Sequence, residues 1–257
     1  MSNNLHEVAE IMGVDEETIK VYPKIKFERN LLNPWGDELL NIFRMLNLSS
    51  KKTALDIPCG QGGVSVYLAK EYGVTVDGYD LLQGFIDNAN EYAKEHNVQD
   101  LCRFITEDIR TAIEMGREYD LVLWSAAPHI WANYKQTVEN LRKCVKQNGY
   151  IVIADAYLYK DEYKDLQPGY ETLEEISKSV TEYGDTIVKL SDYKETLWAD
   201  NYQTDREAVI RAINNSDNQR EKEILKRHLE EINKSELFDI ECLGLYILVL
   251  QVAKITW

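Results

Sequence analysis

Residues 54–63 read ALDIPCGQGG, an apolar run that ends in an acid, Asp56, followed by a loop with three glycines in four positions. A glycine-rich loop between a strand and a helix lets a ligand approach the backbone closely, and nucleotide phosphates are common ligands of such loops. In an open parallel sheet, ligands lie at the carboxyl ends of the strands, where the strand order reverses. The stretch therefore predicts an α/β fold with a ligand site after its first strand.

The acid Asp56 separates two classes of ligand. In a partly desolvated site it would repel the pyrophosphate of a dinucleotide at a cost of about 1 kcal/mol or more, whereas it would attract a cation. A complete GxGxxG dinucleotide motif also needs a glycine at position 65, where this chain has Ser65. The stretch is better matched to S-adenosylmethionine, which carries an ammonium and a sulfonium. The alternative is a plain tight turn with an incidental acid.

Short β-branched runs alternate with amphipathic helical runs from residue 53 to about 155, which is the pattern of repeated βαβ units. Predicted strands cover 53–57, 75–80, 102–107, 119–125 and 150–156. Predicted helices between them cover 64–73, 82–97 and 133–149. The first and third of these helices end near Gly73 and Gly149, each suited to a left-handed C-terminal cap.

The segments outside this core also have readable patterns. Helices are predicted at 6–13, 36–48 and 170–184, strands at 185–195 and 245–255, and a charged helical stretch from about 204 to 234. We predict a single domain, 1–257, divided into an N-terminal helical cap (1–50), a cofactor-binding core (51–157) and a C-terminal half (158–257). The last part carries a helical insertion at about 198–240.

Composition narrows the class of partner. The 257 residues have a formal charge of −15, which disfavours a surface that follows nucleic-acid phosphates. The four cysteines have neither CxxC nor zinc-site spacing, so we expect reduced thiols and no metal. No stretch approaches the roughly 18 apolar residues of a membrane span, and no signal peptide is evident. We expect a soluble, cytoplasmic protein without membrane contact.

The succession of ALDIPCGQGG, VDGYD, ITEDI and YDLVLWS resembles the class I S-adenosylmethionine-dependent methyltransferases, particularly the small-molecule type related to ubiquinone-biosynthesis methyltransferases. The resemblance covers about residues 50–155. It implies a Rossmann-like three-layer sandwich with a mostly parallel seven-stranded sheet whose last strand is antiparallel. It also implies transfer of a methyl group from S-adenosylmethionine to a small-molecule acceptor by in-line displacement.

The resemblance further implies which residues contact the cofactor. Asp80, twenty residues beyond Gly60, would bind both ribose hydroxyls, which suits a carboxylate. Asp108 would accept from the adenine amino group, although an aspartate there also suits the N-cap of the helix that follows, and one residue can do both. Cys59 is expected to serve the shape of the loop without covalent chemistry. The implied cofactor contacts are Asp56, Cys59, Gly60, Gln61, Gly62, Asp80, Leu81, Asp108, Ile109 and Ser125.

The acceptor should lie beyond strands four and five. His129 is a candidate general base, because imidazole titrates near neutral pH, although a lone loop histidine more often caps or packs. Aromatic rings are reasonable neighbours of a cationic methyl donor. The helical insertion is read as a cover for the acceptor, or else as a solvated excursion or dimer surface. The predicted acceptor-side residues are Tyr22, Trp35, His129, Trp131, Tyr157, Trp198 and Tyr202.

Two other functions remain open at this point. A protein could bind S-adenosylmethionine for regulation without transferring the methyl group, and the acids at Asp56, Asp80 and Asp108 would serve that role equally well. A nicotinamide-dependent oxidoreductase is disfavoured by Asp56 and Ser65. The acceptor and its reacting atom are not indicated, and the chain is expected to be a monomer or homodimer.

Overall fold

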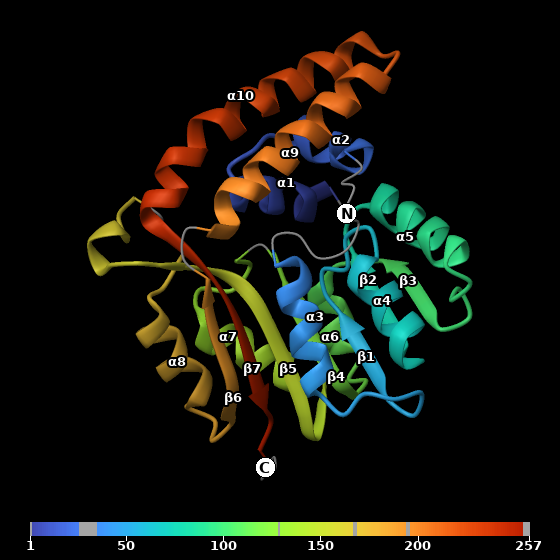
Figure 1. The fold of residues 1–257 in the computed structure, drawn as a ribbon, viewed down its shortest axis with the longest axis vertical. Helices are drawn as coiled ribbons and strands as arrows, with labels where there is room; N and C mark the ends of the chain where they lie inside the picture. The colour runs from blue at the N-terminus through green and yellow to red at the C-terminus, as the bar shows by residue number, and fades with distance from the viewer. Residues whose placement is uncertain (1, 26–34, 128, 167–168, 194–195, 254–257) are drawn as a thin grey trace.

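The computed structural model describes residues 2–25, 35–127, 129–166, 169–193 and 196–253. Seven strands form one sheet in the order β3-β2-β1-β4-β5-β7-β6 (Figure 1). Strand β7 is antiparallel to both of its neighbours, and the other contacts between strands are parallel. The predicted sheet is therefore confirmed. Its strands are β1 (Thr53–Asp56), β2 (Thr75–Asp80), β3 (Cys102–Thr106), β4 (Tyr119–Ser125), β5 (Val145–Leu158), β6 (Thr186–Tyr193) and β7 (Leu243–Gln251).

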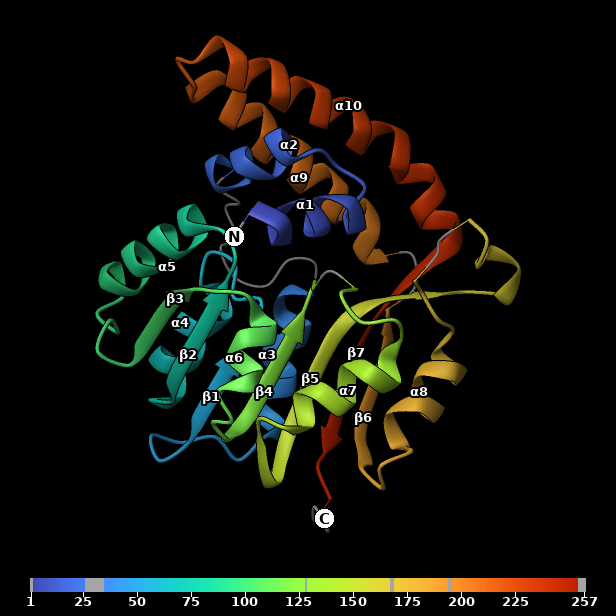
Figure 2. The ribbon, with the colours of Figure 1, turned by 180° about the vertical axis from the view of Figure 1, so that it is seen from behind.

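Helices cover both faces of the sheet, as the three-layer prediction requires (Figures 1 and 2). On one face the helices bury the apolar cluster that contains Phe43 and Leu68, and on the other they bury the cluster that contains Val138 and Ile176. Sheets buried on both faces need nearly continuous apolar strands, and β7 is such a strand. The first face carries α3 (Gly36–Met45), α4 (Gly63–Tyr72) and α5 (Gln83–Glu95); the second carries α6 (Ile109–Glu114), α7 (Tyr134–Arg142) and α8 (Leu173–Thr181).

A helical cap lies over the carboxyl ends of the parallel strands (Figures 1 and 2). We call it the cap and define it as α1 (Ser2–Ile11), α2 (Glu16–Val21), the 3-10 turn η1 (Tyr22–Lys24), α9 (Thr196–Asn215) and α10 (Gln219–Cys242). Its N-terminal and C-terminal parts share one apolar cluster, in which Val21 and Ile25 pack with Val209 and Leu225. The sequence predicted the two parts separately, and the structure joins them.

Ion pairs also connect the two parts of the cap. Arg227 of α10 lies 2.7 Å from Asp15 at the start of α2, and Arg220 lies 2.5 Å from Glu17. Asp15 is also the N-cap of α2, because its side chain accepts from the backbone N–H of Thr18. The predicted helical insertion is thus a pair of long helices packed on the N-terminal segment. The predicted division of the chain into segments 1–50, 51–157 and 158–257 remains a prediction.

One helix boundary in the sequence analysis was wrong. The helix predicted at 133–149 ends at Arg142, and β5 begins at Val145, which pairs with Tyr119 of β4. Gly149 therefore lies inside a strand, and the left-handed residue nearby is Asn148, with φ 62°. The apolar residues of this stretch continued the helical spacing, but pairing with β4 overrode it. The other predicted cap is confirmed, because Gly73 ends α4 with φ 68°.

Within the described residues, no helix combines the length and the apolar character needed to cross a membrane.

Candidate functional site

The glycine loop joins β1 to α4 at the point where the strand order reverses. Gly60 and Gly62 both have positive φ, at 50° and 79°. A Cβ on Gly62 would lie 2.7 Å from the Cβ of Ala89 on α5, so this position requires glycine for its conformation and for space. The backbone N–H of Cys59 donates to the carbonyl of Tyr79, which ties the loop to β2. The loop is therefore fixed against the neighbouring strand.

Asp56 ends β1 and is only 2% exposed. Its carboxylate accepts a hydrogen bond of 2.6 Å from the hydroxyl of Ser65. Burial raises the pKa of Asp56 to about 7; the Ser65 hydrogen bond opposes this shift and the charge of Asp80 adds to it. The ionised form of this buried acid is therefore costly until a cation lies near it.

Asp80 ends β2 and faces the glycine loop. One carboxylate oxygen accepts from the N–H of Gly60 at 3.0 Å, and the other accepts from the N–H of Leu82 at 2.9 Å. Burial raises the pKa of Asp80 to about 6, against the lowering effect of these two backbone hydrogen bonds. A carboxylate offers about four acceptor positions, so two remain for hydroxyl donors such as a ribose diol. Two desolvated acids at one sheet edge fit a ligand that is both cationic and rich in hydroxyls.

Asp108 is the N-cap of α6, as one of the two alternatives proposed. Its side chain accepts from the backbone N–H of Arg110 at 2.8 Å, and it also holds the guanidinium of Arg110. Its neighbour Ile109 is buried, while Leu81 after β2 is half-buried. Contact between Asp108 and an adenine ring remains a prediction, compatible with the capping role.

The end of β4 has an unusual backbone. Ser125 is the last residue of the strand, and Ala126 after it has φ 48°, a left-handed conformation that costs a non-glycine residue about 1 kcal/mol or more. The N–H of Ala126 donates to the carbonyl of Ala154 on β5 at 3.0 Å. Such conformations concentrate at functional sites. This feature lies next to Ser125, which the sequence assigned to cofactor contact.

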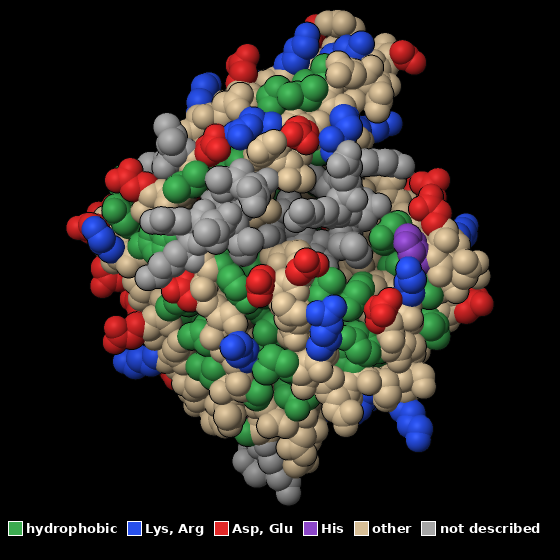
Figure 3. Space-filling view, viewed as in Figure 1, with side chains coloured by type: hydrophobic (Ala, Val, Ile, Leu, Met, Phe, Trp, Pro, Cys, Tyr) green, Lys and Arg blue, Asp and Glu red, His purple; other side chains and the backbone are tan. Residues whose placement is uncertain are grey.

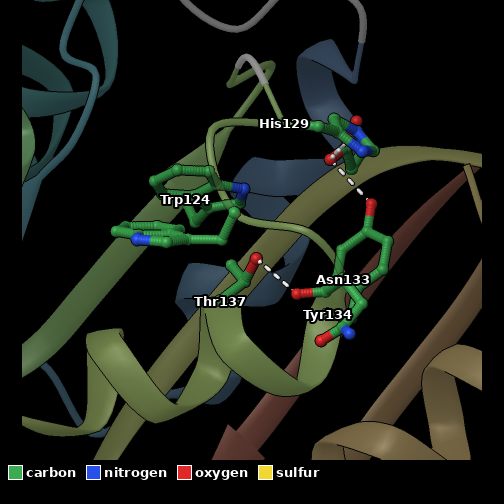
Figure 4. A pocket seen from close by; sticks show the side chains of 7 residues that line it. Trp124, His129, Asn133, Tyr134 and Thr137 are labelled. Carbon is green, nitrogen blue, oxygen red and sulfur yellow. Dashed lines mark hydrogen bonds and ion pairs between the residues drawn. The ribbon is translucent and has the colours of Figure 1, made fainter. Parts of the chain in front are cut away.

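His129 and Trp131 line a small pocket beyond β4 (Figure 4). The ring of Trp131 packs on Trp124 with centroids 5.0 Å apart. His129 Nε2 lies 3.2 Å from a carboxylate oxygen of Asp155, and the same oxygen accepts from the hydroxyl of Tyr134 at 2.7 Å. The other residues that line the pocket are Asn133 and Thr137. The structure thus brings two of the predicted acceptor-side residues, His129 and Trp131, into one pocket.

The surroundings of His129 favour its charged form. Its Nδ1 lies 2.8 Å from the carbonyl of Gly169, and the rings of Tyr134 and Tyr170 pack against it. Burial lowers the pKa of His129, but the charge and hydrogen bonding of Asp155 and the Gly169 carbonyl outweigh it and raise the pKa to about 9. At neutral pH the cationic ring, with a proton on both nitrogens, is therefore the favoured form. The role of His129 as a base stays a prediction, and at pH 7 the ring would first have to lose one of these two protons.

The remaining acceptor-side residues lie elsewhere. Trp35 is 2% exposed and packs in the apolar cluster with α3 and α4, and Tyr157 is 4% exposed with its hydroxyl on Asp192 of β6. Tyr22 packs on His228 of α10, and the hydroxyl of Tyr202 donates to Asp239, so both belong to the cap interior. The backbone of Trp198 lies in α9, and its side chain is outside the described residues.

Gln61, which the resemblance placed among the cofactor contacts, also has a partner in the cap. Its side chain donates to the carbonyl of Ile25 at 2.9 Å, so it joins the glycine loop to the residue that follows the turn η1.

The sequence pattern gives no site role to two residues whose hydroxyls bind the buried acids. Ser65 counts only against a dinucleotide motif, yet its hydroxyl donates to Asp56. Tyr134 lies within a predicted helix, yet its hydroxyl donates to Asp155. Asn133 is a favourable N-cap residue, so the sequence indicates that a helix begins at Tyr134. A residue at the start of a helix that follows β4 lies close to the carboxyl end of that strand, and this is the signal by which Tyr134 could have been identified.

No group of three or more His, Cys, Asp or Glu side chains in the described part of the chain is arranged to hold a metal ion. The four cysteines are free and buried, and burial raises the pKa of the Cys59 thiol well above its usual value, with the charges of Asp80 and Asp56 adding to the shift. A thiol that resists ionisation is a poor nucleophile. This agrees with the expectation that Cys59 contributes shape.

A family profile described as a methyltransferase domain matches residues 54–149. The ubiquinone biosynthesis O-methyltransferase of Rickettsia akari is 33% identical over 114 residues, which are 44% of this chain and 44% of the relative. The phosphoethanolamine N-methyltransferase of Plasmodium falciparum is 26% identical over 191 residues, 73% of this chain and 67% of the relative. The match to the Rickettsia enzyme thus spans less than half of its length.

Solved structures share the fold. A methyltransferase from Thiobacillus denitrificans in complex with S-adenosylhomocysteine has a TM-score of 0.75 at 18% identity, covering 91% of this chain and 98% of the other. A methyltransferase from Geobacter sulfurreducens, with the same ligand, has a TM-score of 0.74 at 19% identity, covering 90% and 96%. The matched domain over residues 54–149, the order of motifs and the shared fold support a class I S-adenosylmethionine-dependent methyltransferase.

Proposed function

We propose that this chain transfers a methyl group from S-adenosylmethionine to a small-molecule acceptor. The observation that carries the proposal is the pair of buried acids, Asp56 and Asp80, that end neighbouring strands on either side of the glycine loop. A pyrophosphate would meet the desolvated charge of Asp56 there, whereas an ammonium would satisfy Asp56 and a ribose diol would satisfy Asp80. Asp56 therefore weighs against a nicotinamide dinucleotide at this edge, while Asp80 suits the ribose of either ligand.

Each residue of the donor site has a task that follows from its position. Asp56 would lie near the cationic methionine end, and Asp80 would hold the ribose while the Gly60 N–H keeps its carboxylate in place. Leu81 and Ile109 would pack on the adenine, and Asp108 would accept from its amino group. S-adenosylmethionine supplies an electrophilic methyl group on a sulfonium when bound.

The acceptor side has to hold a nucleophile about 3 Å from the methyl carbon and in line with the bond that breaks. The pocket of His129 and Trp131 and the cap above the sheet are the parts of the chain that could position it. If His129 acts as a base, replacing it with Ala should lower turnover more than it lowers cofactor affinity. Full activity of the variant would remove it from that role.

A small-molecule acceptor also suits the surface. Acidic side chains are interspersed with Lys and Arg over the face seen in Figure 3, and the chain has a charge of −15. Nucleic-acid binding relies on contiguous basic surface. One relative named above is an O-methyltransferase and the other an N-methyltransferase. The proposal names neither oxygen nor nitrogen as the atom that this chain methylates.

The experiment that tests the proposal is a screen with S-adenosylmethionine labelled on its methyl group. The protein is incubated with a cell metabolite extract, and labelled small molecules are separated and identified. Wild-type protein should label at least one metabolite, and Asp80→Ala should not. Tight binding of S-adenosylhomocysteine without label transfer to any metabolite would favour a regulatory binder. Binding of NADH with no affinity for S-adenosylhomocysteine would favour an oxidoreductase.

A further inference from the structure

The N-terminal part of the cap rests directly on the elements that form the donor site. The side chain of Asn88 on α5 donates to the carbonyl of Pro23 at 2.9 Å, and the side chain of Gln61 donates to the carbonyl of Ile25 at 2.9 Å. A Cβ on Gly84 would lie 2.7 Å from the Pro23 ring, so the turn η1 packs tightly on the start of α5. The cap therefore contacts both the glycine loop and the helix that follows Asp80.

A third contact reaches the adenine side. The guanidinium of Arg110 on α6 binds two carboxylates. Toward Asp108 it donates from Nε at 3.0 Å and from Nη2 at 2.8 Å; toward Glu7 of α1 it donates from Nη1 and Nη2, both at 2.9 Å. Glu7 and Arg110 are 103 positions apart in the sequence. The hydrogen bonds that Arg110 donates to Asp108 and Glu7 raise the pKa of Arg110, so the cation is permanent.

We propose that Arg110 is a positioning residue that couples the seating of cap helix α1 to occupation of the adenine side of the donor site. The proposal rests on the proposed function, because it assumes that the ligand contacts Asp108. A planar guanidinium that holds one carboxylate on each side transmits orientation as well as charge. A ligand that fixes the Asp108 carboxylate also fixes Arg110, and Arg110 in turn fixes Glu7.

The coupling is reciprocal by thermodynamic necessity. If cofactor binding favours the seated α1, then seating of α1 raises cofactor affinity by the same factor. Removing Glu7 should therefore weaken a ligand that Glu7 itself is not proposed to touch. A merely structural ion pair would alter the stability of the protein without this effect on the ligand.

The test compares four full-length variants with the wild type: Glu7→Gln, Arg110→Gln, the double variant of these two, and a control. Glu7→Gln removes the cap side of the bridge only, and Arg110→Gln removes both sides. The matched control is Arg103→Gln, because Arg103 also binds an acid, Asp77, at 3.0 Å, but within β2 and β3 and away from the cap. Calorimetry gives the affinity for S-adenosylhomocysteine, and hydrogen exchange of the α1 amides is measured with and without that ligand.

We expect Glu7→Gln to lower the affinity for S-adenosylhomocysteine by about fivefold, near the lower end of typical coupling. Arg110→Gln should lower this affinity further, and the double variant should bind like Arg110→Gln alone. Arg103→Gln should bind the ligand like the wild type. The ligand should slow exchange in α1 of the wild type and should do so much less in Glu7→Gln.

Two results separate the possible failures. If wild-type protein binds S-adenosylhomocysteine while Glu7→Gln binds it equally well, the coupling is overturned and the proposed function stands. Unchanged α1 exchange on ligand addition overturns the coupling in the same way. If the wild type does not bind the ligand, the proposed function fails and the coupling fails with it. Melting curves verify that each variant is folded.

Discussion

The backbone N–H of Gly60 donates to a carboxylate oxygen of Asp80 at 3.0 Å, so the loop after β1 and the acid after β2 form one unit. Replacing Asp80 with Ala should lower the affinity for S-adenosylhomocysteine by more than tenfold. The ribose hydroxyls would lose their acceptor, and the glycine loop would lose its hydrogen bond from Gly60. Calorimetry measures the affinity. Asp87→Ala, on the exposed side of α5, is the control and should bind normally. Unaltered affinity in Asp80→Ala would remove the ribose assignment.

We expect Asp56 to make cofactor binding depend on pH. Its pKa is raised to about 7 in the free protein, and a nearby cation stabilises the ionised form, so binding below pH 7 has to displace a proton. Affinity for S-adenosylhomocysteine, which carries an ammonium, should therefore rise from pH 6 to pH 8, with proton release on binding at the lower pH. Calorimetry in buffers of different ionisation enthalpy measures that release.

Asp56→Asn supplies the comparison for this pH effect. The amide oxygen can still accept from the Ser65 hydroxyl, while the titrating group is gone. Most of the proton release should disappear, leaving the smaller part that Asp80 contributes, since its pKa is raised to about 6. Proton release identical to that of the wild type would show that Asp56 is not the group involved.

The pair formed by His129 and Asp155 should stabilise the folded protein at low pH. The pKa of His129 rises from 6.5 to about 9 on folding. Its contribution is therefore complete below pH 6.5 and is lost as the pH rises through 9. His129→Gln should lower the free energy of unfolding at pH 6 and have a smaller effect at pH 9.5.

Denaturant melts at the two pH values test this prediction. His96→Gln is a control, because the ring of His96, at the C-cap of α5, contacts Tyr92 and no carboxylate pairs with it among the described residues. An effect of His129→Gln that stays constant from pH 6 to pH 9.5 would contradict the ion pair as the source of stability.

Gly62 and Gly116 offer a matched pair of glycines. Both have positive φ, so Ala at either position costs about 1–2 kcal/mol of backbone strain. A Cβ at Gly116 meets nothing within 4 Å, whereas at Gly62 it would lie 2.7 Å from Ala89 and 2.9 Å from Phe104. Gly62→Ala should therefore destabilise clearly more than Gly116→Ala in denaturant melts. Equal losses would mean that α5 moves aside freely.

The positions of Asp56 and Asp80 in the fold could be predicted because their determinants are local in sequence. The β-strand patterns before Asp56 and Asp80 place both acids at the carboxyl ends of neighbouring parallel strands. The sign of the Asp56 charge is the basis for the prediction of a cation there and against a pyrophosphate. The left-handed cap at Gly73 followed from the same local rules, and it is confirmed.

The acceptor half depends on contacts between segments far apart in sequence. The sequence offered Trp35 and Tyr157 as pocket residues, but pattern alone does not distinguish an aromatic residue of a pocket from one of the core. Both are buried in the apolar layers. Likewise, nothing local indicates that Glu7 meets Arg110 or that Gln61 meets Ile25. The wrong end of the helix that starts at Asn133 has a related cause, since pairing with β4 outweighed helical spacing.

The most direct test of the central claim is a crystal structure of this protein with S-adenosylhomocysteine. We expect both ribose hydroxyls to lie within about 3.2 Å of the Asp80 carboxylate. We also expect the ammonium on the Asp56 side of the glycine loop and the adenine between Leu81 and Ile109. A ligand bound away from the carboxyl ends of β1 and β2, or a ribose that makes no contact with Asp80, would contradict the account.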